Sequence, residues 1–169
     1  MLESKRLIMS KPKLSFSEEL YRIHSNKLAT QYTPKRRHTT IDDTKKMLKA
    51  WKEYWNNNNY GYFIFIEKEN DIVIGSGGAE KMEFSKKEYF NLYYRLDPNA
   101  TGNGYAIEAM VKIINWLHYE IDNTLSFVIR TDKGNSPSIN LAHKLGFQRD
   151  ANFDDFTDEG DVFFFRNLS

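Results

Sequence analysis

Two closely spaced glycines give residues 99–106 the composition of an anion-binding loop. Gly102 and Gly104 stand between an aromatic, strand-like run at 89–96 and apolar residues at helical spacing from 106 to 117. Glycine adopts positive φ readily and lets the backbone approach a ligand closely. The free N–H groups and the dipole of a first helical turn favour a negative charge. This order of strand, glycine loop and helix predicts a pyrophosphate site.

The loop lacks the fingerprints of the two common nucleotide-binding loops. The dinucleotide pattern G-x-G-x-x-G requires a third glycine where the chain has Ile107. The P-loop pattern requires Gly-Lys-Ser/Thr where the chain has Ile107, Glu108 and Ala109. A tight strand-to-helix turn without a ligand remains the alternative interpretation of this stretch.

A second polar segment, residues 135–147, has the signals of a short helix. Asn135 is a plausible N-cap, Pro137 suits the first turn, and Gly146 suits the C-terminus. Ser138 would lie on this helix and offers a hydroxyl group for chemistry.

Together the two segments resemble the GNAT superfamily of acyl-CoA-dependent N-acetyltransferases. The branch most similar is that of the ribosomal-protein N-terminal acetyltransferases (RimJ/RimL-like). Its loop pattern, Q/R-x-x-G-x-G/A continued as G-Y-A-x-E-A, is matched by Gly102, Gly104, Tyr105, Ala106, Glu108 and Ala109. Its later pattern, N-x-x-S…K-L-G-F, is matched by Asn135, Ser138, Lys144, Leu145, Gly146 and Phe147. Residues 3–8 also resemble the first strand of the branch, so the resemblance spans nearly the whole chain.

The resemblance implies that acetyl-CoA is the cosubstrate, with its pantetheine along the strand that ends before the loop. The implied donor-site residues are Tyr94, Leu96, Asn99, Thr101, Gly102, Asn103, Gly104, Tyr105, Ala106, Asn135 and Ser138. Asn99 stands where the family usually has glutamine or arginine, which predicts somewhat weaker phosphate binding.

Two departures from the family concern the proton-transfer groups. Ala142 stands where many members have a tyrosine near the acyl sulfur, and Asn91 stands where the branch often has a glutamate. Ser138, one turn before Ala142, is the expected substitute, with Asn135 as an alternative polar contact. A capping or helix-surface role for Ser138 is the competing interpretation.

The absence of an obvious base favours an acceptor amine of low pKa. An amine with a pKa of about 10.4 needs roughly 4–5 kcal/mol to be neutral at pH 7, whereas an α-amine needs only about 1 kcal/mol. We therefore expect a peptide N-terminus or a small amine, deprotonated through water by Glu80 or Glu88. The catalytic candidates are Ser138, Asn135 and Glu88. A catalytically weak acyl-CoA-binding or partner-binding module is the alternative.

Composition favours a single domain over residues 1–169 that acts on neither nucleic acid nor membranes. The 169-residue chain has a net charge of +1 and no cysteine. Its four histidines lack metal-ligand spacing, so no metal site is expected. The basic run at 35–38 fits a solvated loop better than a contact to an acidic acceptor or to nucleic acid. No apolar run suits a membrane span or signal peptide, so we expect a cytoplasmic protein, either a monomer or a homodimer.

The expected elements must bring the loop and the Ser138 helix to one site. Helices are predicted from a capping box at Ser15 and from another at Thr40, the latter closed by a polar loop at 56–59. Strands are predicted at 6–10, 62–67, 72–75, 89–96, 125–131, 147–156 and 162–167, with a bulge or close ligand approach at 75–78 and a last turn at 158–161. The resemblance implies an α/β (α+β) GNAT fold whose mixed, mostly antiparallel sheet has about six to seven strands and about four helices.

Overall fold

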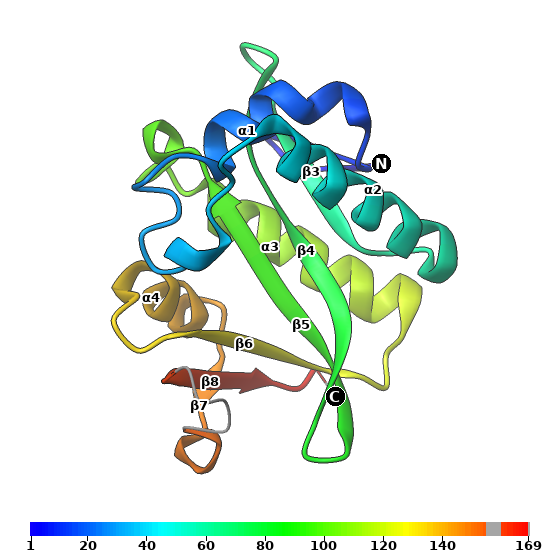
Figure 1. The fold of residues 1–169 in the computed structure, drawn as a ribbon. Helices are drawn as coiled ribbons and strands as arrows, with labels where there is room; N and C mark the ends of the chain where they lie inside the picture. Colours follow the sequence, from blue (N-terminus) through cyan, green and yellow to red (C-terminus); the bar gives the residue numbers. More distant parts are fainter. Residues whose placement is uncertain (155–159, 169) are drawn as a thin grey trace.

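The computed structural model describes residues 1–154 and 160–168 and contains one mixed sheet of eight strands (Figure 1). The strands are β1 (Leu2–Glu3), β2 (Leu7–Ser10), β3 (Tyr62–Glu67), β4 (Ile72–Phe84), β5 (Lys87–Leu96), β6 (Ser126–Asp132), β7 (Gln148–Arg149) and β8 (Asp161–Arg166). Their order is β1-β2-β3-β4-β5-β6-β8-β7, and only β5 and β6 pair in parallel. The predicted α+β class is confirmed. The strand count exceeds the expectation because β1, a two-residue edge strand, was not predicted.

Four α-helices of the described residues cover the two faces of the sheet. They are α1 (Ser17–His24), α2 (Ile41–Asn58), α3 (Tyr105–Trp116) and α4 (Ser136–Lys144), and α3 continues into a π-helical turn, η4 (Leu117–Ile121). In Figure 1, α1 and α2 lie in front of the sheet and α3 lies behind it. We call the α1/α2 side the front face and the α3 side the back face. None of the described helices has the length and apolarity to cross a membrane.

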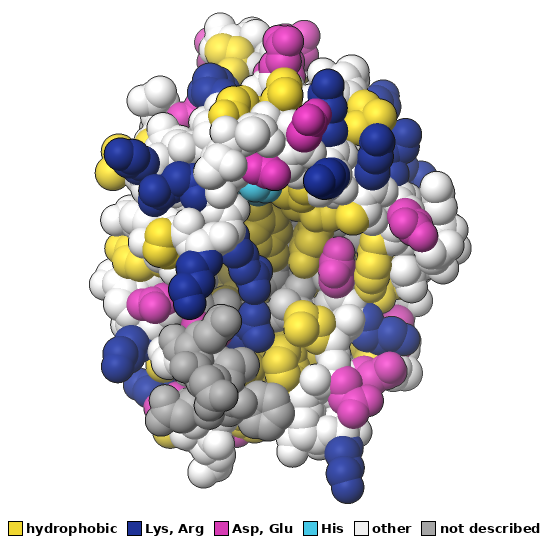
Figure 2. Space-filling model, viewed as in Figure 1, with side chains coloured by type: hydrophobic (Ala, Val, Ile, Leu, Met, Phe, Trp, Pro, Cys, Tyr) yellow, Lys and Arg dark blue, Asp and Glu magenta, His cyan; other side chains and the backbone are white. Residues whose placement is uncertain are grey.

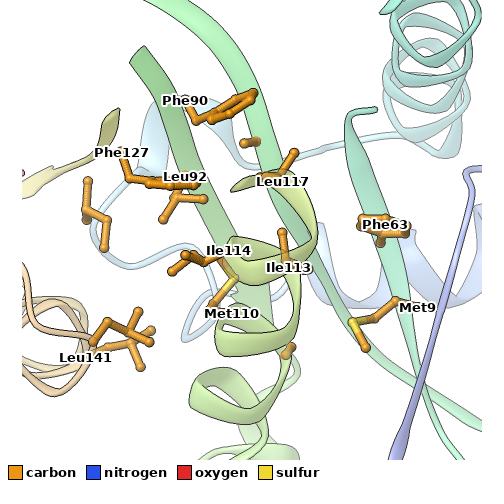
Figure 3. Packing of buried hydrophobic residues seen from close by; sticks show 14 of the residues in the cluster. Met9, Phe63, Phe90, Leu92, Met110, Ile113, Ile114, Leu117, Phe127 and Leu141 are labelled. Carbon is orange, nitrogen blue, oxygen red and sulfur yellow. The ribbon is translucent and has the colours of Figure 1, made fainter. Parts of the chain in front are cut away.

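The main core lies on the back face. Met110, Ile113 and Ile114 of α3 are fully buried or nearly so and belong to one cluster with Phe90 and Phe127 of β5 and β6 (Figure 3). Burying such a side chain contributes roughly 1.5–3 kcal/mol. This apolar contact holds α3, and therefore the glycine loop before it, at a fixed position on the sheet.

Helix capping follows the prediction at one site and departs from it at two. The Thr40 capping box is confirmed, since Asp43 N donates to Thr40 Oγ1 (3.4 Å) and Thr40 N donates to Asp43 Oδ2 (3.1 Å). The Ser15 box is wrong, because residues 14–16 form a 3₁₀ turn and α1 begins at Ser17 with no side-chain cap. The predicted loop at 56–59 is also wrong. The helix continues to Asn58, and Asn59, with φ of 63°, ends it.

The glycines of β4 allow strands to approach one another. A Cβ on Gly75 would lie 2.2 Å from the Arg95 carbonyl oxygen, and one on Gly78 would lie 2.3 Å from the Gly61 carbonyl oxygen. The strand runs unbroken through 75–78, and the bulge lies just before it, because Phe65 pairs with Gly75 whereas Ile66 pairs with Val73. Of the two predicted alternatives, the bulge is thus found one residue earlier than expected, and the close approach seen at Gly75 and Gly78 is that of neighbouring strands.

The C-terminal pair is shorter than predicted. Within the described part of the predicted strand, residues 147–154, the strand covers Gln148–Arg149, and a 3₁₀ turn over Ala151–Phe153 follows it. Positions 158 and 159 of the expected turn lie outside the described residues.

The sheet divides between β5 and β6. These strands pair only from Tyr89 with Ser126 to Leu92 with Ile129, although β5 continues to Leu96 and β6 to Asp132. They diverge beyond this point (Figure 1). The end of β5 therefore has one edge unpaired by β6, directly before the glycine loop.

Candidate active site

The loop between β5 and α3 has the backbone geometry of an anion site. Gly102 and Gly104 adopt φ of 81° and 78°, and Gly104 is the N-cap of α3. The first helical hydrogen bond runs from Glu108 N to Gly104 O (3.1 Å). The N–H groups of the preceding first turn, residues 105–107, therefore have no partner within the helix and can serve an anion.

Side chains of the loop hold its own backbone. The Oδ1 of buried Asp97 accepts a hydrogen bond from Asn99 N (3.0 Å), while its carboxylate also pairs with Arg22 of α1. Thr101 Oγ1 donates to Pro98 O (2.8 Å), and Asn103 Nδ2 donates to Ala100 O (3.3 Å). Thr101 and Asn103 thus shape the loop, and their main-chain groups remain the candidate ligand contacts.

Arg6 and Glu108 fasten the N-terminal strands to this loop. Arg6 Nε donates to Glu108 Oε1 (2.8 Å), and Arg6 Nη1 donates to Asn103 O (2.9 Å). Ser4 Oγ donates to Glu108 Oε2 (2.6 Å). Although burial opposes it, these hydrogen bonds hold the pKa of the Glu108 carboxyl below its usual value. Arg6 was not predicted as a site residue, because its partners lie about a hundred positions away and no local pattern reports them.

The back face of the divided sheet brings Tyr94 to Ser138. Tyr94 alternates with Leu92 and Leu96 toward the cluster that contains α4, where its phenol lies near Ser138. Burial raises the pKa of the Tyr94 phenol, and the Ser138 side chain opposes the shift. Ser138 is only 8% exposed, and its N–H donates to Asn135 Oδ1 (3.2 Å). Asn135 therefore caps α4 and positions Ser138.

Position 142 offers no proton donor and no room for a larger group. Ala142 is fully buried in the core cluster, one turn after Ser138 on α4. The hydroxyls of Ser138 and Tyr94 are the polar pair that this part of the structure presents instead.

The front face brings Glu80 to Asn91. These residues are direct cross-strand partners on β4 and β5, which places their side chains on the same face about 5 Å apart at Cβ. Asn91 Nδ2 donates to Met82 Sδ (3.0 Å), and its buried Oδ1 has no partner among the described residues. Burial raises the pKa of the Glu80 carboxyl. Glu80 of β4 thus lies beside position 91 of β5, where the branch often has a glutamate.

Glu88 lies apart from this group. Its side chain is exposed, and its Oε2 is 3.6 Å from Lys81 Nζ. Six positions of extended strand, about 20 Å, separate it from Tyr94. The structure therefore brings Glu80 closer than Glu88 to the part of the sheet where β5 and β6 divide.

A groove with an aromatic floor opens on the front face. The space-filling view shows a hollow with a hydrophobic floor, basic side chains along one side and an acidic one on the other (Figure 2). On the front face of these strands, the ring centroid of Tyr62 lies 5.1 Å from that of Trp51 and 5.0 Å from that of Tyr93. We call this hollow, with Tyr62, Glu80, Asn91, Tyr93 and Arg95 on its strands, the front groove. No three His, Asp or Glu side chains of residues 1–154 and 160–168 are grouped to hold a metal ion.

Comparisons with known proteins agree with this arrangement. The chain is 26% identical over 155 residues to the uncharacterized N-acetyltransferase p20 of Bacillus licheniformis, covering 92% of this chain and 86% of that protein. An acetyltransferase structure from Agrobacterium tumefaciens superposes with a TM-score of 0.82 at 17% identity, over 99% of this chain and 94% of the other.

Ribosomal-protein acetyltransferases share the fold. The ribosomal-protein-S5-alanine acetyltransferase of Vibrio fischeri has a TM-score of 0.74 at 18% identity, over 98% of this chain and 95% of the other. RimL, the ribosomal L7/L12 α-N-protein acetyltransferase in complex with coenzyme A, has a TM-score of 0.78 at 17% identity, over 98% and 96%. The family model for the acetyltransferase (GNAT) domain matches residues 6–148. The chain belongs to the GNAT acetyltransferase family, whose members transfer an acetyl group from acetyl-CoA.

Proposed function

We propose that this chain is an N-acetyltransferase that acetylates an α-amine or another amine of low pKa, in a ternary complex with acetyl-CoA. The observation that carries the proposal is that two pairs of polar side chains lie on opposite faces of the divided sheet. Tyr94 and Ser138 lie on the back face, and Glu80 and Asn91 lie on the front face. A thioester between β5 and β6 would have one pair on each side.

The donor site fits the pyrophosphate and pantetheine of acetyl-CoA. The N–H groups at the start of α3 and the positive-φ glycines suit the pyrophosphate. The edge of β5 that β6 leaves unpaired, at 93–96, offers main-chain groups to an extended ligand. Acetyl-CoA supplies the activated acetyl group.

On the front face, Glu80 is the proposed base and acts directly or through one water. The unpartnered Oδ1 of Asn91 accepts a hydrogen bond from the acceptor amine and orients it. As the C–N bond forms and the C–S bond breaks, the carboxylate of Glu80 takes the proton that the amine loses. Its raised pKa brings it closer to neutral pH, which suits a general base.

On the back face, Ser138 is the proposed acid. Its hydroxyl gives a proton to the leaving sulfur and takes one in turn from the nearby Tyr94 phenol, which solvent then reprotonates. Asn135 fixes the start of α4 and therefore acts as a positioning residue.

The acceptor proposed on the strength of the fold relatives is a peptide N-terminus, with a small amine as the second candidate. Two of the structural neighbours act on ribosomal proteins according to their names. The front groove lies over an aromatic cluster of the strands, which suits an extended chain.

Release of free thiol from acetyl-CoA, measured across peptides, polyamines and aminoglycosides, tests the function. We expect turnover with peptide α-amines and a fall in kcat of about 10–100-fold in Ser138→Ala, because general acid assistance is lost. The KM for acetyl-CoA should change less than about threefold. Ser136→Ala, an exposed serine on the same helix, is the matched control. Tight CoA binding without turnover of any acceptor would instead identify a binding module.

A further inference from the structure

We infer that the acceptor carries a carboxylate two or three residues from its reacting amine, and that Arg95 binds this carboxylate at the α1 end of the front groove. The inference rests on the proposed function, because it names the acceptor class for that site.

Arg95 is an incompletely satisfied cation on the front face of β5. Its Nη2 donates to Thr33 Oγ1 (2.9 Å), and its guanidinium lies 6.0 Å from the centre of the Tyr93 ring. Its Nη1 is buried and has no hydrogen-bond partner among the described residues. Leaving such a donor unmatched is unfavourable, and more so for a charged group. A ligand oxygen would satisfy it once the guanidinium turns toward the groove.

Four of the eight arginines of the chain pair with carboxylates, and Arg95 is not one of them. Arg6 pairs with Glu108, Arg22 with Asp97, Arg130 with Asp161 and Arg149 with Asp154. No ion pair links Arg95 to a carboxylate in the part of the chain that the structure describes. A guanidinium that lines a groove without its own counter-ion is suited to an anion that arrives with the substrate.

Two further unmatched polar groups lie around Arg95. Ser76, its direct cross-strand partner on β4, is fully buried with an unpartnered Oγ, and the Nε2 of buried His24 on α1 is also unpartnered. Burial, with a contribution from Arg95, lowers the pKa of His24 to about 3. His24 is therefore neutral and adds no charge beside Arg95.

The spacing along β5 sets the length of the acceptor. Asn91, beside Glu80, and Arg95 lie on the same face four residues apart, about 13 Å along the strand. The amine and carboxylate of a free α-amino acid lie too close together to span this length. An extended peptide with an acidic side chain or a C-terminal carboxylate at its second or third residue spans it, since each residue adds about 3.3 Å and the arginine side chain supplies the remainder.

Binding of product analogues tests the inference independently of turnover. The probes are N-acetylated tripeptide amides with glutamate or glutamine at position 3, titrated calorimetrically into the CoA complex, and an N-acetyl dipeptide with a free C-terminus. We expect the glutamate peptide or the dipeptide acid to bind at least tenfold more tightly than its amide counterpart. Equal affinity of acid and amide for both pairs would overturn the inference, whether or not the protein acetylates any acceptor.

Two variants locate the effect. Arg95→Gln should remove the acid-over-amide preference, whereas Lys35→Gln, which removes an exposed charge of the nearby loop, should keep it. A preference that persists in folded Arg95→Gln overturns the assignment of Arg95. Arg95→Lys keeps the charge but not the planar fork and should retain only part of the preference. CoA binding by each variant verifies folding, and the comparison of acid and amide in the unmodified protein stands even if a variant does not fold.

Discussion

The residues proposed to take the proton of the amine and to protonate the leaving sulfur lie on opposite faces of the sheet. Ser138 and Tyr94 lie on one side of β5, and Glu80 and Asn91 lie on the other. The departures at positions 91 and 142 were visible in the sequence, and Ser138 was predicted as the replacement. The pairing of Glu80 with Asn91 was not predicted. Cross-strand register depends on the length of the 84–87 turn and on pairing that a single strand does not encode.

Replacing Glu80 with glutamine should make catalysis strongly dependent on the amine's own ionisation. At pH 7 we expect kcat/KM for a peptide α-amine to fall about 100-fold, because the proton acceptor is lost. The deficit should shrink toward pH 9, where the α-amine is already neutral. Initial rates between pH 6 and pH 9 measure this.

The exposed Glu83→Gln is the matched control for that profile and should follow the unmodified protein. If Glu88→Gln shows the pH-dependent deficit and Glu80→Gln does not, the base is Glu88 through a water relay and our assignment is wrong.

At the scale of elements, the sequence was most informative where local chemistry decides the structure. The Thr40 capping box and the glycine loop are set by neighbouring residues, and both formed as predicted. The Ser15 cap and the end of α2 were wrong, since tertiary packing decides between an α-helical and a 3₁₀ first turn and between Asn56 and Asn58 as the last residues. The division between β5 and β6 was not predicted, because it depends on the pairing of strands that lie far apart in the sequence.

Gly104→Ala should weaken CoA binding more than it weakens the fold. Gly104 has φ of 78° at the N-cap of α3, so alanine costs about 1–2 kcal/mol of stability there and shifts the N–H groups of the first turn. Gly146→Ala, at φ of 82° beyond α4, carries the same backbone penalty away from the loop. Urea unfolding should show similar losses for both, and only Gly104→Ala should raise the Kd for CoA, by at least about tenfold. Equal CoA affinities would contradict an anion role for this turn.

At the scale of the molecule, a buried neutral histidine ties stability to pH. Burial, Arg95 and His38 lower the pKa of His24 to about 3, whereas the unfolded chain has a value near 6.5. Below pH 6.5 the His24 side chain therefore binds a proton in the unfolded state but not in the folded state. Stability from this group is present above about pH 6.5 and is lost as the pH falls toward 3.

We expect the unmodified protein to lose about 2 kcal/mol more unfolding free energy between pH 7.5 and pH 5 than His24→Gln does. Urea unfolding at both pH values, with constant ionic strength, measures the difference. Parallel losses in the two proteins would show that His24 is protonated as readily in the folded state as in the unfolded one.

The unpaired edge of β5 also concerns the protein without its ligands. Edge strands are sites where other chains add themselves, and proteins usually protect the edges at the margins of their sheets. Here an edge lies in the middle of the sheet, between β5 and β6, where neither α3 nor a charged rim can cover it without closing the site. A cosubstrate that hydrogen-bonds along β5 takes the place of a strand there. We therefore expect added CoA to slow the self-association of this protein on storage, in addition to any effect on its unfolding temperature.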